Sequence, residues 1–277
     1  MTESVTHPRD LAGKIAVVTG AAQGLGLGMA EVLARRGVHV VLADLKKDLA
    51  EQSAVGLRDQ GLSAEAVAID IGSSGSVNDC FEQIVRKNSR LDIVVNNAGV
   101  GQNVAAVVSL SDEEWQRVIN ITLTGAFYCC RAAGRIMQSQ ESGTIVNISS
   151  INGQNPAALV AAYNVAKAGV ISLTRCLALE MAAYGVRVNA VCPGPVYTEF
   201  NRTVMAQRCQ SLNLEEEQMI ERIRGAIPLG RWGQAQDIGE AVAFLCSPQA
   251  SWITGEVMRV SGGLEGVSAA PPKAPKP

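Results

Sequence analysis

The sequence predicts an α/β fold: a doubly wound three-layer sandwich around a central, mostly parallel seven-stranded sheet. Two observations predict it. Short β-branched apolar runs alternate with longer helical patterns along the whole chain, which is typical of doubly wound folds. The runs are continuously apolar rather than alternating, and this indicates strands buried on both faces, as in a parallel sheet covered by helices.

The candidate strands follow one another at intervals that leave room for helices. In chain order they are residues 15–19, 38–43, 66–69, 91–95, 144–148, 186–191 and 257–260. In open sheets of this Rossmann type, ligands bind beyond the carboxyl ends of the strands. The loops that follow these runs are therefore where chemistry is expected.

The length of 277 residues and the mass of 29.1 kDa suit one large α/β domain. We expect this domain to span residues 11–268, after a flexible N-terminus at 1–10. The long, polar stretch 195–226 interrupts the strand–helix rhythm and is the candidate substrate lid. The end of the chain, 269–277, is rich in Pro, Lys and Ala, a composition typical of disorder.

Composition excludes several function classes. The net charge of −2 without a long basic run argues against nucleic acid as a partner. No apolar stretch approaches the ~20 residues that cross a membrane, and the polar N-terminus lacks the apolar core of a signal peptide. His7 and His39 are the only histidines, so no His-based metal site or Ser-His-Asp triad is expected. Seven scattered cysteines without Cys-x-x-Cys indicate buried thiols in a reducing cytoplasm.

A glycine-rich turn follows the first candidate strand and opens a helical pattern. It reads Thr-Gly-Ala-Ala-Gln-Gly-Leu-Gly over residues 19–26. Glycines let the backbone approach a pyrophosphate, and the following helix N-terminus offers N–H donors and a positive dipole end. The strand–turn–helix context that such a motif requires is present, so the turn predicts a dinucleotide site.

Asp44 ends the second strand pattern, 24 positions after Gly20. A carboxylate near this interval accepts hydrogen bonds from the adenosine ribose hydroxyls. It would repel a 2′-phosphate, and about 1.4 kcal/mol of repulsion already gives tenfold discrimination. Lys46 and Lys47 resemble the start of a solvated helix. The predicted cofactor is therefore NAD rather than NADP.

Tyr163 and Lys167 stand four residues apart in a helical pattern, which places them on one helix face. A free tyrosine has a pKa of about 10, too high for a good base at neutral pH. A cation about 4 Å away, at an effective dielectric near 20, is worth roughly 4 kcal/mol, or about three pKa units. On this argument Lys167 lowers the pKa of Tyr163 into the range of efficient proton transfer.

Over residues 11–265 the sequence resembles a classical short-chain dehydrogenase/reductase. The family's Thr-Gly-x-x-x-Gly-x-Gly pattern matches residues 19–26, and its Asn-Asn-Ala-Gly signature matches 96–99. Ser150 stands 13 residues before Tyr163, the spacing of the family's catalytic serine. Asp70-Ile71 resembles the pair that holds adenine, and Pro193-Gly194 with Thr198 resembles the segment that grips the nicotinamide carboxamide.

The resemblance implies that Tyr163 exchanges the hydroxyl proton, Lys167 lowers its pKa and binds the nicotinamide ribose, and Ser150 binds the substrate oxygen. The expected catalytic residues are Ser150, Tyr163 and Lys167. The expected cofactor-binding residues are Gly20, Gln23, Gly24, Leu25, Gly26, Asp44, Leu45, Asp70, Ile71, Asn97, Ala98, Gly99, Tyr163, Lys167, Pro193, Gly194, Val196 and Thr198. No metal is expected.

One position departs from the family pattern. Counted from Trp115 and Phe127, the place of the usual fourth catalytic residue, an Asn, falls on Thr122. Asn120 lies two residues earlier, on a different helix face. The family Asn helps to hold a proton-relay water, largely through its backbone carbonyl, so a Thr could keep part of that role.

The expected substrate is a small-molecule alcohol or carbonyl compound. The expected pocket walls, 100–103, 151–160 and 197–225, carry Asn103, Asn152, Gln154, Asn155, Glu199, Asn201 and Arg202. These polar side chains suit a sugar, sugar acid or polyol, or are simply exposed loop residues. The alternatives are a 3-oxoacyl-thioester reductase and, in another class, a non-catalytic NAD(H) sensor. The resemblance also implies a homotetramer, or failing that a homodimer, joined through the helices that carry Phe127 and Tyr163 and near the C-terminus.

Overall fold

The computed structural model describes residues 9–198, 205–206, 209 and 215–266. Of the expected N-terminal segment it describes Arg9 and Asp10, and of the candidate lid 195–198, 205–206, 209 and 215–226. The predicted tail, 269–277, lies outside the described residues.

The described chain forms one seven-stranded parallel sheet in the order β3-β2-β1-β4-β5-β6-β7. The strands are β1 (Ile15–Thr19), β2 (His39–Asp44), β3 (Ala64–Ala68), β4 (Ile93–Asn96), β5 (Gly143–Ile148), β6 (Val186–Pro193) and β7 (Val257–Val260). The predicted doubly wound fold is confirmed, and within the described residues every strand pair is parallel. The strand order reverses between β1 and β4, where such sheets open a crevice for ligands.

Two predicted strands begin two residues away from their observed starts. β3 begins at Ala64 rather than at residue 66, because Ala64 and Glu65 pair with Val40 and Val41 of β2. A search for apolar runs misses Glu65, whose carboxylate pairs with the Lys87 ammonium and lies 3.4 Å from the His39 ring. β4 begins at Ile93 rather than at residue 91, since Asp92 turns its side chain to the cations of Lys14 and Arg90.

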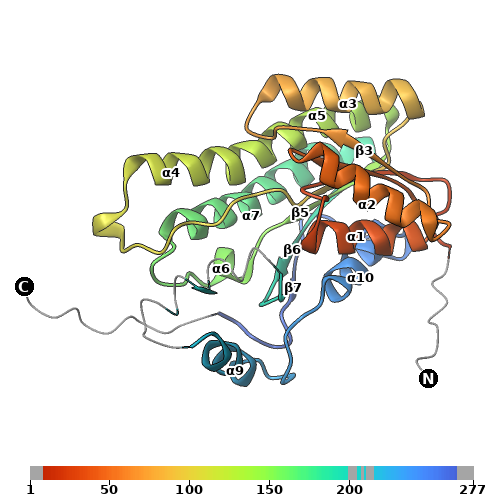
Figure 1. The fold of residues 1–277 in the computed structure, drawn as a ribbon. Helices are drawn as coiled ribbons and strands as arrows, with labels where there is room; N and C mark the ends of the chain where they lie inside the picture. The colour runs from red at the N-terminus through yellow and green to blue at the C-terminus, as the bar shows by residue number, and fades with distance from the viewer. Residues whose placement is uncertain (1–8, 199–204, 207–208, 210–214, 267–277) are drawn as a thin grey trace, which may run out of the picture.

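Helices cover both faces of the sheet (Figure 1). One face packs against α1 (Gly24–Arg35), α2 (Lys47–Asp59) and α10 (Ala235–Cys246). The other face packs against α3 (Ser74–Asn88), α5 (Gly125–Gln140) and α7 (Ala161–Met181). The shorter helices are α4 (Asp112–Val118), the π-helical segment η2 (Ile119–Thr124), α6 (Ile151–Gln154) and α9 (Glu216–Ala226), together with the 3₁₀ turns η1 (Val107–Ser109), η3 (Ala182–Tyr184) and η4 (Pro248–Ala250).

The core explains why the strands are continuously apolar. Val17, Val18, Val40, Val41 and Val94 are all fully buried, with neighbours along each strand facing opposite helical layers. This burial leaves the loops at the carboxyl ends of the strands as the place where polar side chains gather.

Candidate active site

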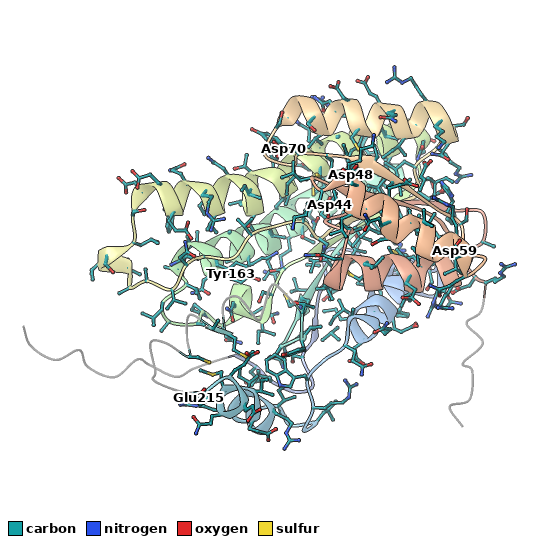
Figure 2. The ribbon with its side chains drawn as sticks, viewed as in Figure 1. Asp44, Asp48, Asp59, Asp70, Tyr163 and Glu215 are labelled. Carbon is teal, nitrogen blue, oxygen red and sulfur yellow. The ribbon has the colours of Figure 1, made fainter. Side chains whose placement is uncertain are left out.

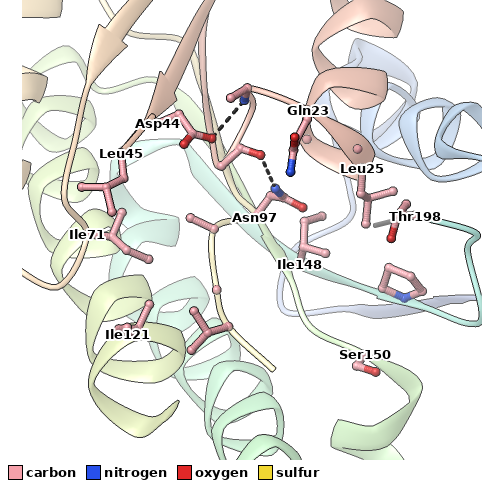
Figure 3. Close-up of a pocket in the computed structure, with 18 of the residues that line it drawn as sticks. Gln23, Leu25, Asp44, Leu45, Ile71, Asn97, Ile121, Ile148, Ser150 and Thr198 are labelled. Atoms are coloured by element: carbon pink, nitrogen blue, oxygen red, sulfur yellow. Dashed lines mark hydrogen bonds between the residues drawn. The ribbon is translucent and has the colours of Figure 1, made fainter. Parts of the chain in front are cut away.

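One cavity of about 630 Å³ lies at the carboxyl ends of the strands. This volume is within the range of cofactor and substrate sites. Every residue that the sequence singled out as catalytic or cofactor-binding lines it. They are Gly20, Gln23, Gly24, Leu25, Gly26, Asp44, Leu45, Asp70, Ile71, Asn97, Ala98, Gly99, Ser150, Tyr163, Lys167, Pro193, Gly194, Val196 and Thr198. Figure 3 draws part of this lining, including Gln23, Asp44 and Ser150.

The glycine-rich turn after β1 is closed against the loop after β4. The side-chain amide of Asn97 donates to the carbonyls of Thr19 and Gly20, at 2.9 and 3.1 Å. In return, the Thr19 hydroxyl accepts the backbone N–H groups of Asn97 and Ala98. A Cβ at Gly26 would lie 2.2 Å from the carbonyl oxygen of Gly20 and 2.7 Å from the Asn97 amide. Only glycine fits there, so the turn can stay tight.

The first turn of α1 offers donors for an anion. Its N-cap residue, Gln23, makes no side-chain cap, and no acidic residue stands in the first turn. Gly24, Leu25 and Gly26 line the cavity there. A helix N-terminus of this kind suits a pyrophosphate. The residues present therefore fit a dinucleotide.

Backbone N–H groups of the protein itself hold the Asp44 carboxylate at the end of β2. One carboxylate oxygen accepts the N–H of Ala22 at 3.0 Å, and the other accepts the N–H of Lys46 at 2.9 Å. Figure 3 shows this side chain at the edge of the cavity, beside the glycine-rich turn. A carboxylate has about four acceptor positions. The remaining ones are therefore available to the two hydroxyls of a ribose.

The side chains of Ser150 and Tyr163 reach the same part of the cavity from different elements. Ser150 is the N-cap of α6, where its hydroxyl accepts the N–H of Asn152 at 3.1 Å. Tyr163 is the third residue of α7 (Figure 2), and a hydrogen bond joins its phenol to Ser150. Two hydroxyl groups thus converge on one point, where a substrate oxygen could accept or give a proton.

Lys167 lies one turn beyond Tyr163 on α7, as the spacing predicted. Its ammonium donates to the carbonyl of Ile148 at 2.8 Å and lies 5.8 Å from the centroid of the Tyr163 ring. The side chain is only 6% exposed. A buried ammonium with a neutral partner loses hydration, so burial lowers the pKa of Lys167 to about 8.

The predicted net shift of the Tyr163 pKa is wrong in direction. Burial raises the pKa of Tyr163 to about 12, while the hydrogen bond with Ser150 acts in the opposite direction. The spacing argument counted the charge of Lys167 and omitted the desolvation of the phenolate. The same burial weakens the protonation of Lys167, so its attraction does not compensate.

Gly153 lets the segment that carries Ser150 pack closely against α7. A Cβ at Gly153 on α6 would lie 2.8 Å from the carbonyl carbon and oxygen of Lys167 and from the Ser149 hydroxyl. That hydroxyl also donates to the carbonyl of Lys167, at 2.8 Å. The segment that carries Ser150 is therefore held directly against the helix that carries Tyr163 and Lys167.

Thr122, at the place of the family's Asn, is buried in the π-helical segment η2. Its hydroxyl accepts the N–H of Val100 at 3.0 Å and donates to the carbonyl of Val100 at 3.1 Å. Asn120 is exposed, in agreement with its expected position on another face. Thr122 therefore fixes the loop that follows Gly99, by contacts that a short amide side chain could also make.

Seven further residues line the cavity: Ala22, Lys46, Ile69, Val100, Ile121, Ile148 and Ser149. Of these the sequence singled out only Val100, as a substrate wall. Ile69, Ile148 and Ser149 end or directly follow strands, so strand-end position was the signal that could have found them. Ile121 enters from η2, and no sequence signal places it there.

The polar residues expected to bind a polyol divide into three groups. Asn155 donates its amide to the carbonyl of Glu265, at 2.6 Å. Asn103, Asn152 and Gln154 are described but do not line the cavity. Glu199, Asn201 and Arg202 lie outside the described residues.

The cysteines are free thiols, and all except Cys176 are buried. The part of the chain that the structure describes contains no group of three or more His, Cys, Asp or Glu side chains that could hold a metal ion. A membrane-spanning helix is likewise missing from those residues, since none is long and apolar enough.

Comparison with known proteins agrees with this geometry. A family model described as enoyl-(acyl carrier protein) reductase matches residues 20–265. The cis-4-hydroxycyclohexanecarboxylate dehydrogenase of Sinomonas cyclohexanicum is 38% identical, with 92% of this chain and 98% of that protein covered.

Two solved structures extend the comparison. NAD+-bound xylitol dehydrogenase has a TM-score of 0.86 at 31% identity, with coverage of 91% of this chain and 99% of that one. An actinorhodin polyketide ketoreductase variant with NADPH has a TM-score of 0.88 at 32% identity, with coverage of 94% and 100%. The fold, the arrangement of the site and these similarities agree: the chain belongs to the classical short-chain dehydrogenase/reductase family.

Proposed function

We propose that this oxidoreductase transfers hydride between NAD(H) and a secondary alcohol or ketone. One observation carries the proposal. Ser150, Tyr163 and Lys167 line the same cavity as Asp44 and the glycine-rich turn, and Figure 3 shows Ser150 well apart from Asp44. A substrate hydroxyl near Ser150 and a dinucleotide along the turn would then share one enclosed space.

In this proposal each polar residue has a defined role. The Ser150 hydroxyl donates to the substrate oxygen as that oxygen gains negative charge, and Tyr163 exchanges a proton with it. Lys167 binds the nicotinamide ribose and favours the phenolate form of Tyr163 by its charge. The nicotinamide, when bound, supplies or accepts the hydride. The raised pKa of Tyr163 keeps its phenol protonated at neutral pH, which suits proton donation to a ketone.

The preference for NAD rests on Asp44, which is held by two backbone N–H groups and would face a 2′-phosphate. Lys46 also lines the cavity, but its side chain is exposed to solvent. We expect Asp44→Asn to raise NADP use relative to NAD by about tenfold or more, since 1.4 kcal/mol corresponds to a factor of ten. Lys46→Ala should change the ratio little. The measurement is kcat/KM with each cofactor, and an unchanged ratio in Asp44→Asn would contradict the assignment.

For the substrate we propose a sugar, sugar acid or polyol. The similarity to a xylitol dehydrogenase supports this choice, and the similarity to a dehydrogenase of a hydroxycyclohexane carboxylate makes a cyclic alcohol the nearest competitor. A 3-oxoacyl thioester is the second candidate, because the matching family model is described as an acyl-carrier-protein reductase. A non-catalytic NAD(H) sensor is disfavoured by the presence of Ser150, Tyr163 and Lys167 together.

The test is NAD reduction measured against sugars, sugar acids, polyols, cyclic alcohols and simple secondary alcohols, and NADH oxidation against a 3-oxoacyl thioester. Turnover that disappears in Tyr163→Phe supports the reaction class, and the preferred compound identifies the substrate. A strong preference for cyclic ketones would remove the polyol. NADH binding without turnover of any compound would favour the sensor.

A homotetramer, or failing that a homodimer, fits the apolar side chains left on the surface. Phe127 on α5, Val165 and Leu179 on α7, and Trp252 near β7 are all exposed, Trp252 by 99%. These are the helices and the C-terminal region that the family resemblance assigns to subunit contacts. Free thiols in the chain fit a cytoplasmic location. Sedimentation of the wild type and of Leu179→Glu tests the assembly.

A further inference from the structure

The first turn of α7 begins at a buried place without a cap from its own N-cap residue. The first N–H groups of a helix have no partner within the helix. Val160, the N-cap residue, has an apolar side chain and makes no side-chain hydrogen bond. Tyr163 is the third residue of this helix, so any fraying of the turn moves the phenol directly.

Gln102 supplies the missing acceptor from the loop after β4. Its side-chain oxygen accepts the N–H of Ala162 at 2.7 Å and that of Tyr163 at 3.4 Å. Gln102 is only 2% exposed, so this acceptor lies away from bulk water. A residue far upstream in the chain thus caps the helix that carries Tyr163.

The same amide also holds the turn that leads into α7. Its nitrogen donates to the carbonyl of Leu159 at 3.3 Å, and the N–H of Ala105 donates to the same carbonyl at 3.0 Å. Leu159 has φ of 69°, in the left-handed region that side chains other than glycine rarely adopt. Such a conformation persists where its surroundings fix it, and Gln102 is part of those surroundings.

Gln102 is itself held on both sides. Thr122 holds both backbone groups of Val100, and the Arg117 guanidinium donates to the carbonyl of Gly101 at 2.7 Å. On the other side, the Glu114 carboxylate accepts the N–H of Asn103 at 2.7 Å. The acceptor for α7 is therefore fixed to α4 and η2, and through Gly99 to the loop that lines the cavity.

We propose that Gln102 is a positioning residue for the reaction: its amide sets the first turn of α7 and so holds the Tyr163 phenol against Ser150. This inference rests on the proposed function for its kinetic readout. Gln102 does not line the cavity, and it acts through the backbone of Ala162 and Tyr163.

The chain provides a matched control in Gln140, at the other end of the sheet. Its side-chain oxygen accepts the N–H of Leu91 at 2.9 Å, and its nitrogen donates to the carbonyl of Leu91 at 2.8 Å. Gln102→Leu and Gln140→Leu remove comparable amide contacts, and both should lower stability. Only Gln102→Leu should lower kcat, by tenfold or more, while the Kd for NADH stays within twofold. Equal kcat values for the two folded variants would overturn the proposal.

Gln102→Glu tests whether the acceptor is what matters. It keeps an oxygen for Ala162 and Tyr163, and a negative charge is favourable at a helix N-terminus. We expect kcat to recover to within about fivefold of the wild type. The pH profile should move upward, because a nearby negative charge disfavours the phenolate. A variant as slow as Gln102→Leu, with an unmoved profile, would overturn the proposal.

A measurement without substrate separates this proposal from the proposed function. Tyrosine labelled with carbon-13 at Cζ gives a phenol signal for Tyr163, assigned by its loss in Tyr163→Phe. In Gln102→Leu this signal should shift or broaden, and in Gln140→Leu it should stay unchanged. If the wild type turns over no alcohol or carbonyl, the proposed function fails while this comparison still decides the role of Gln102. An unmoved signal in Gln102→Leu would refute that role.

Discussion

The two ends of the sheet each hold a buried charge, but the two charges have different kinds of partner. At the amino ends, Asp92 is 4% exposed, and its carboxylate pairs with Lys14 and Arg90 and accepts the N–H of Ile15 at 2.9 Å. At the carboxyl ends, Lys167 is 6% exposed and donates to the uncharged carbonyl of Ile148. One charge is surrounded by opposite charges, and the other is held beside a phenol.

The difference in partners indicates which of the two buried charges serves stability and which serves catalysis. A buried charge with ion-pair and hydrogen-bond partners stabilises the fold or costs it little, whereas one with a neutral partner carries its desolvation cost. A strained or costly group persists at a functional site because activity requires it. The lowered pKa of Lys167 is the electrostatic sign of that cost.

The largest effect should come from Lys167→Met. Loss of the ammonium should lower turnover by roughly 10²–10⁴, the range of general acid–base contributions. The same variant should be more stable than the wild type, by up to roughly 3 kcal/mol at pH 7, because about 1.4 kcal/mol corresponds to each pKa unit. The measurement is steady-state kinetics together with urea unfolding.

The lowered pKa of Lys167 also determines how the free energy of unfolding changes with pH. The folded-state pKa of about 8 lies below the ordinary value of 10.5, so between these pH values the unfolded chain binds more protons. The cost is fully present below pH 8 and disappears toward pH 10.5. The stability gained in Lys167→Met should therefore shrink as pH rises through this window. A variant less stable than the wild type at pH 7 would refute the contrast.

Asp92→Asn should have the reverse pattern. It removes the charge that Lys14 and Arg90 share, and hydrogen bonds to charged groups contribute about 1.5–3 kcal/mol each. Both cations are about half exposed and regain water, so we expect a loss at the lower end of that range. Turnover per folded molecule should not change. Asp59→Asn, on the exposed end of α2, is the control and should shift stability by less than about 0.5 kcal/mol.

The raised pKa of Tyr163 predicts that the two reaction directions differ in pH dependence. Ketone reduction needs the protonated phenol, which is present at neutral pH. Alcohol oxidation needs the phenolate, whose fraction rises as pH approaches the raised pKa. Oxidation kcat should therefore increase several-fold from pH 7 to pH 9, while reduction should not. Oxidation that is flat over this range would place the operating pKa of Tyr163 below 7 and restore the spacing argument.

Sequence patterns predicted the features that depend on residues close together in the chain. Continuous apolar runs gave the strands because both sheet faces are buried, and the four-residue spacing placed Tyr163 and Lys167 on one face of α7. The start of β3 was missed because Glu65 meets its cation, Lys87, only in the folded chain. The sign of the pKa shift of Tyr163 was missed for a similar reason, since burial is not visible in a four-residue motif. The contact of Gln102 with α7 depends on packing between distant segments.

The smallest expected effect concerns Thr122, which lies between the two behaviours. Its hydroxyl is buried and fully hydrogen-bonded, as Asp92 is, yet it holds the loop that lines the cavity. Thr122→Val leaves both backbone groups of Val100 without this partner, at a cost of about 1–3 kcal/mol. Thr122→Ser keeps the hydroxyl and should cost less than about 1 kcal/mol.

If the loop matters only for stability, Thr122→Val unfolds at lower urea with unchanged kcat. We expect instead that kcat falls several-fold in Thr122→Val but not in Thr122→Ser. Thr122→Asn should keep the rate, because an amide can also accept from and donate to Val100.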